Sequence, residues 1–204
     1  PEEIRPTALA LNIIISLIAF LNHRKTCDFP KELFWQLALF SIPAAFIGGL
    51  MVVNTTIYMN LLGVLLFFPI LQFLGVFPKS KYQIIEKKTW IPPLIGMLIG
   101  FMSGLIGIGG GIILSPLLLM LGWTNIRQTA ALSALFIFVN SVAGYIGTVG
   151  FDLSFNKTLW IFIPSTIFAG MLGSYYGARR FNVQILKNLL TLVLAGAAIK
   201  LILS

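Results

Sequence analysis

Apolar residues form long runs separated by short polar segments. These runs cover about residues 4–22, 33–53, 57–78, 91–122, 128–149, 158–178 and 183–203. Most of them are close to the roughly 20 residues that an α-helix needs to cross about 30 Å of hydrocarbon. The pattern therefore predicts an all-α integral membrane protein, a polytopic bundle of helices that forms one domain over residues 1–204.

The fourth run has an unusual length. As one straight helix, residues 91–122 would extend about 48 Å, which is too long for one crossing, whereas two full crossings need about 40 residues. Inside this run, residues 104–116 read GLIGIGGGIILSP, with five glycines among eight residues. Each glycine costs a helix roughly 1 kcal/mol relative to alanine. We therefore expect one half-helix to end there and another to begin at about Ile112.

The charges of the loops favour a particular path for this broken segment. If it is a re-entrant hairpin that enters and leaves on one side, 11 of the 14 Lys and Arg residues lie on that side. Only Arg5, Lys157 and Lys200 then lie opposite, whereas a full crossing would divide the charges 9 against 5. Because cytoplasmic loops carry an excess of Lys and Arg, the re-entrant hairpin is preferred.

The sequence also contains an internal repeat. IRPTA at 4–8 returns as IRQTA at 126–130, and FSIPAAFIGGL at 40–50 resembles FIPSTIFAGML at 162–172. With a hairpin that does not cross, each unit has three crossings, and an odd number turns the second unit upside down. We expect two inverted three-crossing repeats, with residues 1–78 as the C-terminal part of the first, 79–90 as a cytoplasmic linker and 91–204 as the second. At the offset of 122 residues between the first pair of motifs, the partner of the glycine segment would precede Pro1, so we expect an N-terminally incomplete chain.

Composition narrows the classes of function. The chain is 58% hydrophobic and 10% charged, whereas soluble domains carry about 25% charged residues. Its net charge of +8 is accounted for by the loops, so we expect no nucleic-acid partner. All six acidic residues fall outside the apolar runs, which argues against an intramembrane proton relay or cation site. We expect no catalytic residues, no metal site, no cofactor and no enzyme activity.

The glycine break provides a candidate binding site for a small anion. The first N–H groups of a helix have no partner within it and lie at the positive end of its dipole. Glycine also lets a ligand approach the backbone closely. We assign Gly107, Gly109, Gly110 and Gly111 to this site, with Ser115 offering a hydroxyl at the same level. Close helix packing is the alternative, and it is preferred for the glycines spaced four apart at 96, 100 and 104.

Neutral polar residues of the neighbouring spans could complete the site. Ser133 and Asn140 are seven residues apart and share a helical face, with Thr129 one turn away from Ser133. Asn12, in the corresponding span of the first repeat, could face them. For each residue the competing interpretation is a hydrogen bond between helices, worth about 0.6 kcal/mol. Arg127, at the mouth of a span, could attract the anion, although an anchoring role at the inner surface is preferred.

A resemblance to a known family rests mainly on residues 100–147, which read GFMSGLIGIGGGIILSPLLLMLGWTNIRQTAALSALFIFVNSVAGYIG. This stretch resembles the signature of the sulfite exporter TauE/SafE family, also called the four-toluene-sulfonate uptake permease family. TALALN, IPAAFIGGL and GARRF elsewhere in the chain add to the resemblance. It implies a multi-pass transporter of the bacterial inner membrane with two related halves, which moves sulfite, organosulfonates or other sulfur-containing anions. Family members carry a glycine motif in each half, and the first is missing here.

Together these features predict a permease or exporter for small anions. Outward flow of an anion could be driven by the membrane potential, about 2.3 kcal/mol per charge per 100 mV. The alternative is a non-transporting membrane subunit that scaffolds a partner complex. The expected partners are a small anionic substrate and the lipid bilayer; neither the identity of the anion nor the oligomeric state is predicted.

Overall fold

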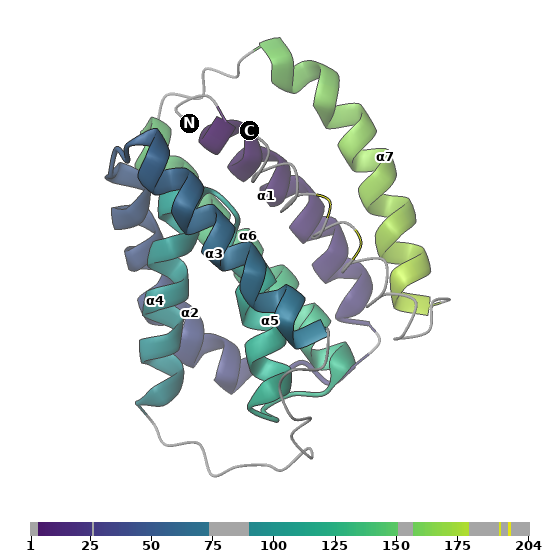
Figure 1. The fold of residues 1–204 in the computed structure, drawn as a ribbon. Helices are drawn as coiled ribbons and strands as arrows, with labels where there is room; N and C mark the ends of the chain where they lie inside the picture. Colours follow the sequence, from purple (N-terminus) through teal and green to yellow (C-terminus); the bar gives the residue numbers. More distant parts are fainter. Residues whose placement is uncertain are drawn as a thin grey trace.

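The structure, a computed structural model, describes residues 4–25, 27–73, 90–150 and 157–179, with the isolated positions 192 and 196. Within these residues the chain forms helices and no strand (Figure 1). They are α1 (Ile4–His23), α2 (Lys31–Leu50), α3 (Thr55–Phe73), α4 (Ile91–Ile106), α5 (Gly111–Met120), α6 (Ile126–Val149) and α7 (Lys157–Arg179). The all-helical prediction is confirmed. The predicted linker 79–90 lies outside the described residues except for its last position, as does nearly all of the seventh apolar run.

Three helices of the described part are long and apolar enough to cross a membrane. They are α1 from Arg5 to His23, α2 over Lys31–Leu50 and α6 over Ile126–Val149. In contrast, α4 has 16 residues and α5 has 10, so each is shorter than a usual span. The anomalous fourth run is therefore divided into two short helices.

Local sequence signals set the ends of α6. At its start, the Asn125 side chain accepts a hydrogen bond from the Gln128 N–H at 2.9 Å, and the Gln128 side chain accepts one from the Asn125 N–H at 3.2 Å. This reciprocal capping satisfies two N–H groups that the first turn leaves without partners. At its end, Gly150 adopts a positive φ of 72°. The 24 residues between these ends form the helix against which the rest of the bundle is assembled.

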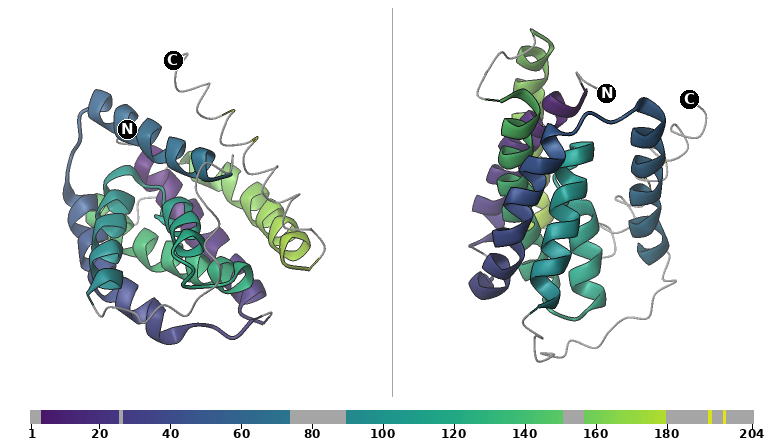
Figure 2. Two further views of the ribbon diagram at one scale, coloured as in Figure 1. Left: turned by 60° about the horizontal axis from the view of Figure 1, so that its bottom comes forward. Right: turned by 90° about the vertical axis from the view of Figure 1, so that its left-hand side faces the viewer.

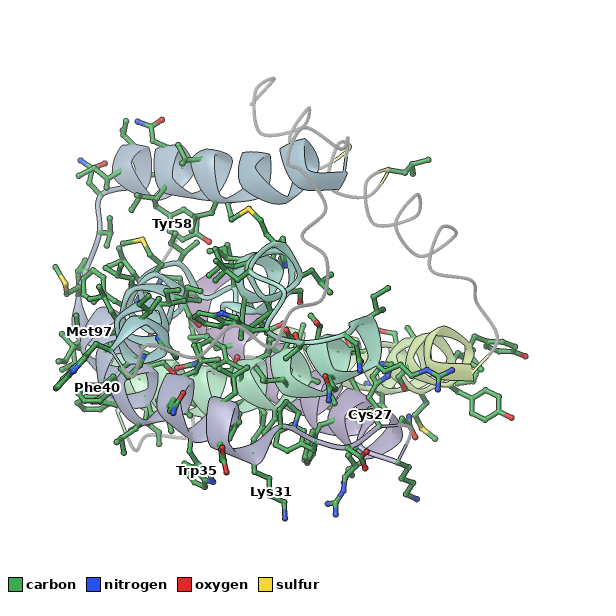
Figure 3. All side chains as sticks on the ribbon, turned by 90° about the horizontal axis from the view of Figure 1, so that it is seen from below. Cys27, Lys31, Trp35, Phe40, Tyr58 and Met97 are labelled. Atoms are coloured by element: carbon green, nitrogen blue, oxygen red, sulfur yellow. The ribbon has the colours of Figure 1, made fainter. Side chains whose placement is uncertain are left out.

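The bundle is built around α2 and α6. Helix α2 packs against α4 and α6, and α1 packs against α6 and α7 (Figure 1). Helix α3 lies at the outside of the bundle, next to α4 and α5 (Figure 2). Figure 3 shows Tyr58 pointing from α3 towards the other helices, whereas Trp35 on α2 points away from them. Tyr58 is accordingly 6% exposed and Trp35 61% exposed.

A seam of small residues holds α2 and α4 together in parallel. A Cβ added at Gly96, Gly100 or Gly104 would collide with the backbone of Leu37, Ser41 or Ala45, respectively. The residue numbers on α2 and on α4 both increase by four from one contact to the next, so the two helices run in the same direction. In lipid the hydrophobic effect does not drive helices together, so they associate through close van der Waals packing of their backbones at small residues. The packing interpretation of these three glycines is thus supported.

We expect Gly100→Ala to destabilise the protein by roughly 1–3 kcal/mol, because the added methyl group must push α2 and α4 apart. Unfolding of the purified protein by titration with SDS measures this change. Gly173→Ala on α7 is the matched control, since nothing lies within 4 Å of a Cβ added there. Equal shifts of the two unfolding midpoints would contradict the seam.

Candidate functional site

The chain breaks at the glycines, as predicted. Helix α4 ends at Ile106, and its C-cap Gly107 has a φ of 85° and donates its N–H to the Ser103 carbonyl at 2.8 Å. Gly109 and Gly110 follow with φ of 77° and 74°, and α5 begins at Gly111. Residues with a side chain rarely adopt such left-handed angles. Three positive φ angles among four residues explain why glycine is concentrated here.

The direction of the chain reverses across this break. Gly104 of α4 packs on Gly144 of α6, and Gly110 lies beside both Ile99 of α4 and Phe136 of α6. Ile99 therefore lies near Phe136 and Gly104 near Gly144, so α4 runs parallel to α6. Gly110, six residues after Gly104, lies back at the level of Ile99. Helix α5 runs antiparallel to α6, because Gly111 contacts Ile137 and Ser115 bonds to Ser133. The N-terminus of α5 thus lies beside the middle of α6, inside the bundle.

Backbone donors collect at the start of α5. Within the described residues, no hydrogen bond is donated by the N–H groups of Gly109, Gly110, Gly111 or Ile112. The first donor of α5 with a partner is Ile113, whose N–H reaches the Gly110 carbonyl at 3.3 Å. These N–H groups lie at the positive end of the helix dipole. They can bind an anion without any fixed positive charge.

Polar side chains from two other helices reach the glycines. Asn12 of α1 donates from Nδ2 to the Gly107 carbonyl at 3.2 Å, and this nitrogen lies 3.4 Å from where a Cβ of Gly109 would be. Ser141 of α6 places its Oγ 3.0 Å from the same point. Ser103 of α4 lies beside Gly110, with its Cβ 3.3 Å from the position of an added Cβ. The structure therefore brings α1, α4 and α6 together around the break.

Within the described part of the chain, two of these hydroxyl groups have no hydrogen-bond partner. Ser141 is fully buried and Ser103 is 2% exposed, yet neither Oγ is bonded. Leaving a buried polar group without a partner costs about 1–3 kcal/mol, so each such group needs an explanation. Neither serine was among the site residues predicted from the sequence. The position of Ser103 one turn before Gly107 was a signal that could have identified it.

The remaining predicted residues have partners of their own. Ser115 donates to the Gly111 carbonyl at 2.9 Å and to Ser133 Oγ at 2.8 Å, so these three residues meet one turn into α5. Asn140 instead accepts from Ser41 of α2 at 2.9 Å and donates to the Phe136 carbonyl at 2.9 Å.

Thr129 lies 2.7 Å from Thr124, oxygen to oxygen, near the start of α6. It also donates to the Asn125 carbonyl at 2.8 Å. The polar residues of α6 thus form hydrogen bonds with different helices. Within the described residues, Thr129 and Asn140 are not bonded to the glycine segment. Their role as ligands stays a prediction.

Arg5 joins three helices beside the break. It is 6% exposed, and its guanidinium donates to Met51 at 2.8 Å, Gly48 at 3.2 Å, Gly49 at 3.1 Å and Gly104 at 2.9 Å, in each case to the backbone carbonyl. Three of these carbonyls belong to the C-terminal end of α2, where a positive charge is favourable. From the sequence, Arg5 was expected only to be a charge at the end of a span. A cavity of about 240 Å³ borders it.

The opposite end of the bundle is more basic. The end of α1 meets the start of α6 there, because Cys27 Sγ lies 3.6 Å from the Arg127 carbonyl. Burial, together with the nearby Asp28 carboxylate, raises the pKa of the Cys27 thiol, although Arg127 opposes this. A raised pKa keeps the thiol protonated and unreactive near neutral pH. Among the residues that the structure describes, no three His, Cys, Asp or Glu side chains are grouped as a metal site requires.

The chain is similar to several proteins named as membrane transporters. A probable membrane transporter protein of Sinorhizobium fredii is 32% identical over 208 residues, covering 99% of this chain and 83% of that protein. One of Methanocaldococcus jannaschii is 29% identical over 147 residues, covering 69% of this chain and 53% of that protein. The probable membrane transporter protein MamO of Magnetospirillum gryphiswaldense is 29% identical over 134 residues, covering 61% and 21%, respectively.

No solved structure matches the chain significantly. The family model described as sulfite exporter TauE/SafE matches residues 1–201, which is nearly the whole chain. The family and the names of the relatives indicate a membrane transporter. The chain belongs to the sulfite exporter TauE/SafE family.

Proposed function

We propose that the protein transports small oxyanions, such as sulfite, organosulfonates or related sulfur oxyanions, and binds them at the N-terminus of α5. The observation that carries this proposal is the set of N–H groups from Gly109 to Ile112, which have no partner within the described residues and lie inside the bundle. Such a set of donors suits the oxygen atoms of an anion. The family name and the relatives named as transporters support movement of a substrate across the membrane.

The chemistry of the break favours an anion over a cation. A divalent metal cation or a proton relay is typically held by carboxylates, and the acidic residues of the whole chain are Glu2, Glu3, Asp28, Glu32, Glu86 and Asp152. None lies within α4, α5 or α6. The donors at the break are backbone N–H groups, an amide and hydroxyls, and the Arg5 guanidinium adds a positive charge beside them. An oxyanion can accept hydrogen bonds from these donors.

The directions of the helices support the re-entrant hairpin and the inverted repeats. Under the repeat, α1 corresponds to α6, and α2 corresponds to α7. Gly147 of α6 meets Phe46 of α2 and Asn140 meets Ser41, so α2 and α6 are parallel. Gly170 packs on Ile15, and Asn22 bonds to Ser174 at 2.7 Å, so α1 and α7 are also parallel.

Leu9, in the first half of α1, packs on Gly144 near the end of α6. Cys27, shortly after the end of α1, lies beside Arg127 at the start of α6. Helices α1 and α6 are therefore antiparallel. Corresponding helices therefore run in opposite directions, as an inverted repeat requires. The reversal at the glycines, with α4 parallel and α5 antiparallel to α6, is what a re-entrant hairpin requires. We infer that the basic end, with Arg24, Lys25, Lys31 and Arg127, faces the cytoplasm of a bacterial inner membrane.

Flux measured with the purified full-length protein in liposomes tests this function. We expect sulfite to leave loaded vesicles at least about tenfold faster than from protein-free vesicles, and faster when the interior is negative. Gly110→Leu should return the flux to background, since a side chain at Gly110 would meet Ile99 at 2.9 Å and Phe136 at 3.1 Å. Absence of sulfite and methanesulfonate flux from well-folded wild-type protein would instead favour the scaffolding subunit.

A further inference from the structure

The cavity of about 240 Å³ beside Arg5 lies at the end of the bundle opposite the basic end. It is lined by Arg5, by residues 49–53 where α2 ends, and by Thr148 near the end of α6. Among these lining residues Arg5 carries the only charge. The volume is several times the roughly 30 Å³ that a water molecule occupies in the liquid, so the cavity has room for a small oxyanion.

The guanidinium of Arg5 is not saturated by the protein groups around it. Nη2 donates to three carbonyls, Nη1 donates only to Met51, and the buried Nε has no partner within the described residues. Because a guanidinium has five N–H donors, the Nε donor and one donor of Nη1 are unused. In the described part of the chain, Arg5 is paired with neutral carbonyls and with no carboxylate. An anionic acceptor would bond to it about twice as strongly as a neutral one.

This cavity and the glycine break lie along one face of α6. Ser141 lies beside Gly109 of the break, and Thr148, seven residues after Ser141, lines the cavity. Seven residues are about two helical turns, or roughly 10 Å. The backbone of Arg5 also reaches the break, since its carbonyl oxygen lies 3.3 Å from where a Cβ of Gly107 would be. The two places are therefore close neighbours, and the cavity is the one nearer the end of the bundle.

We propose that the cavity is a second anion site, in which a small oxyanion that has left the glycine break bonds to the unused donors of the Arg5 guanidinium. This inference rests on the proposed function, to which it adds a step at the end of the bundle that faces away from the cytoplasm. The anion gives the buried positive charge a counter-charge. Its next position after the break is therefore about 10 Å nearer to that surface.

Replacing Arg5 is a poor test of this site, because the replacement also removes the bonds that join α1 to α2 and α4. Val52 is a better position, since it lines the same cavity and is 83% exposed. Val52→Asp adds a carboxylate that competes with the oxyanion for Arg5. Val52→Asn is the matched neutral control. Neither should lower the midpoint of unfolding by SDS, because Val52 is exposed.

Flux into liposomes that contain the full-length protein compares the two variants. Val52→Asp should raise the sulfite concentration for half-maximal flux about tenfold, as the loss of a hydrogen bond to a charged group would do. Val52→Asn should stay within about twofold of the wild type. Equal half-maximal concentrations in the two variants would overturn the second site and leave the proposed function intact.

Diffraction from crystals of the wild-type protein grown with sodium selenite, a heavier analogue of sulfite, locates the sites directly. We expect anomalous selenium density both at the start of α5 and between Arg5 and Thr148. Density at α5 alone would overturn the second site but not the proposed function. Wild-type protein that neither binds selenite nor moves sulfite would overturn both.

Discussion

Gly109→Ala is expected to lower anion flux about 100-fold, as the loss of two hydrogen bonds to a charged ligand at about 1.5 kcal/mol each would do. The new methyl group would lie 2.7 Å from Ile137 Cγ2 and 3.0 Å from Ser141 Oγ. It would therefore force Ile137 or the backbone of the break to shift, which displaces the N–H groups proposed to bind the anion. The φ of 77° adds strain of roughly 1–2 kcal/mol for a residue with a side chain. Liposome flux, normalised to the amount of correctly folded protein, measures the effect.

The strain and the loss of the site can be separated by a matched variant. Gly150 also has a positive φ, of 72°, with a ψ of −147°, but nothing lies within 4 Å of a Cβ added there. Gly150→Ala should therefore lose stability through backbone strain alone, with flux close to that of the wild type. Equal loss of flux in both variants would mean that backbone strain, and not the site, explains the effect at Gly109.

Arg5→Met should cause the largest loss of stability, about 3–5 kcal/mol, because several buried carbonyls lose their donor at about 1–3 kcal/mol each. The substitution leaves carbonyls of Met51, Gly48, Gly49 and Gly104 without their donor. It also removes the positive charge from the C-terminal end of α2. Arg5→Lys should recover part of the loss, because an ammonium keeps the charge but has fewer donors and no planar fork. Unfolding by SDS titration, monitored by circular dichroism, gives these differences.

Arg24→Met is the control for this effect. Arg24 is exposed at the opposite end of α1, and its guanidinium carbon lies 5.7 Å from the centre of the Phe20 ring. Its replacement should change stability by no more than about 0.5 kcal/mol. If Arg5→Met and Arg24→Met unfold at the same SDS fraction, the buried guanidinium does not hold these helices together.

The helices and the break could be predicted because their causes are local. Runs of about 20 apolar residues define spans by length and composition alone. The expected start of the second half-helix at Ile112 differs from the observed start of α5 by one residue. Glycine is the residue that tolerates a positive φ, so a dense group of glycines marks a break wherever it occurs. The family resemblance followed from the same segment and is confirmed over residues 1–201.

The composition of the site could be predicted only in part. Helical spacing correctly placed Ser133 and Asn140 on one helix, but it could not show that Asn140 bonds to Ser41, 99 residues away. Nor could it show that Ser115 donates a hydrogen bond to Ser133. The same holds for Ser141, which lies beside Gly109 and has no partner within the described residues. Spacing states which residues share a face. It does not state which helix that face meets.

By itself, the sequence determined the membrane-type helices, the break at the glycines and the family. The tertiary structure decided which polar groups bond to one another and which have no partner within the described residues. It also showed that Arg5 binds carbonyls 43 to 99 residues away. The physical reason is that a helix satisfies its own backbone over four residues, whereas a buried side chain is satisfied only by the helices packed around it.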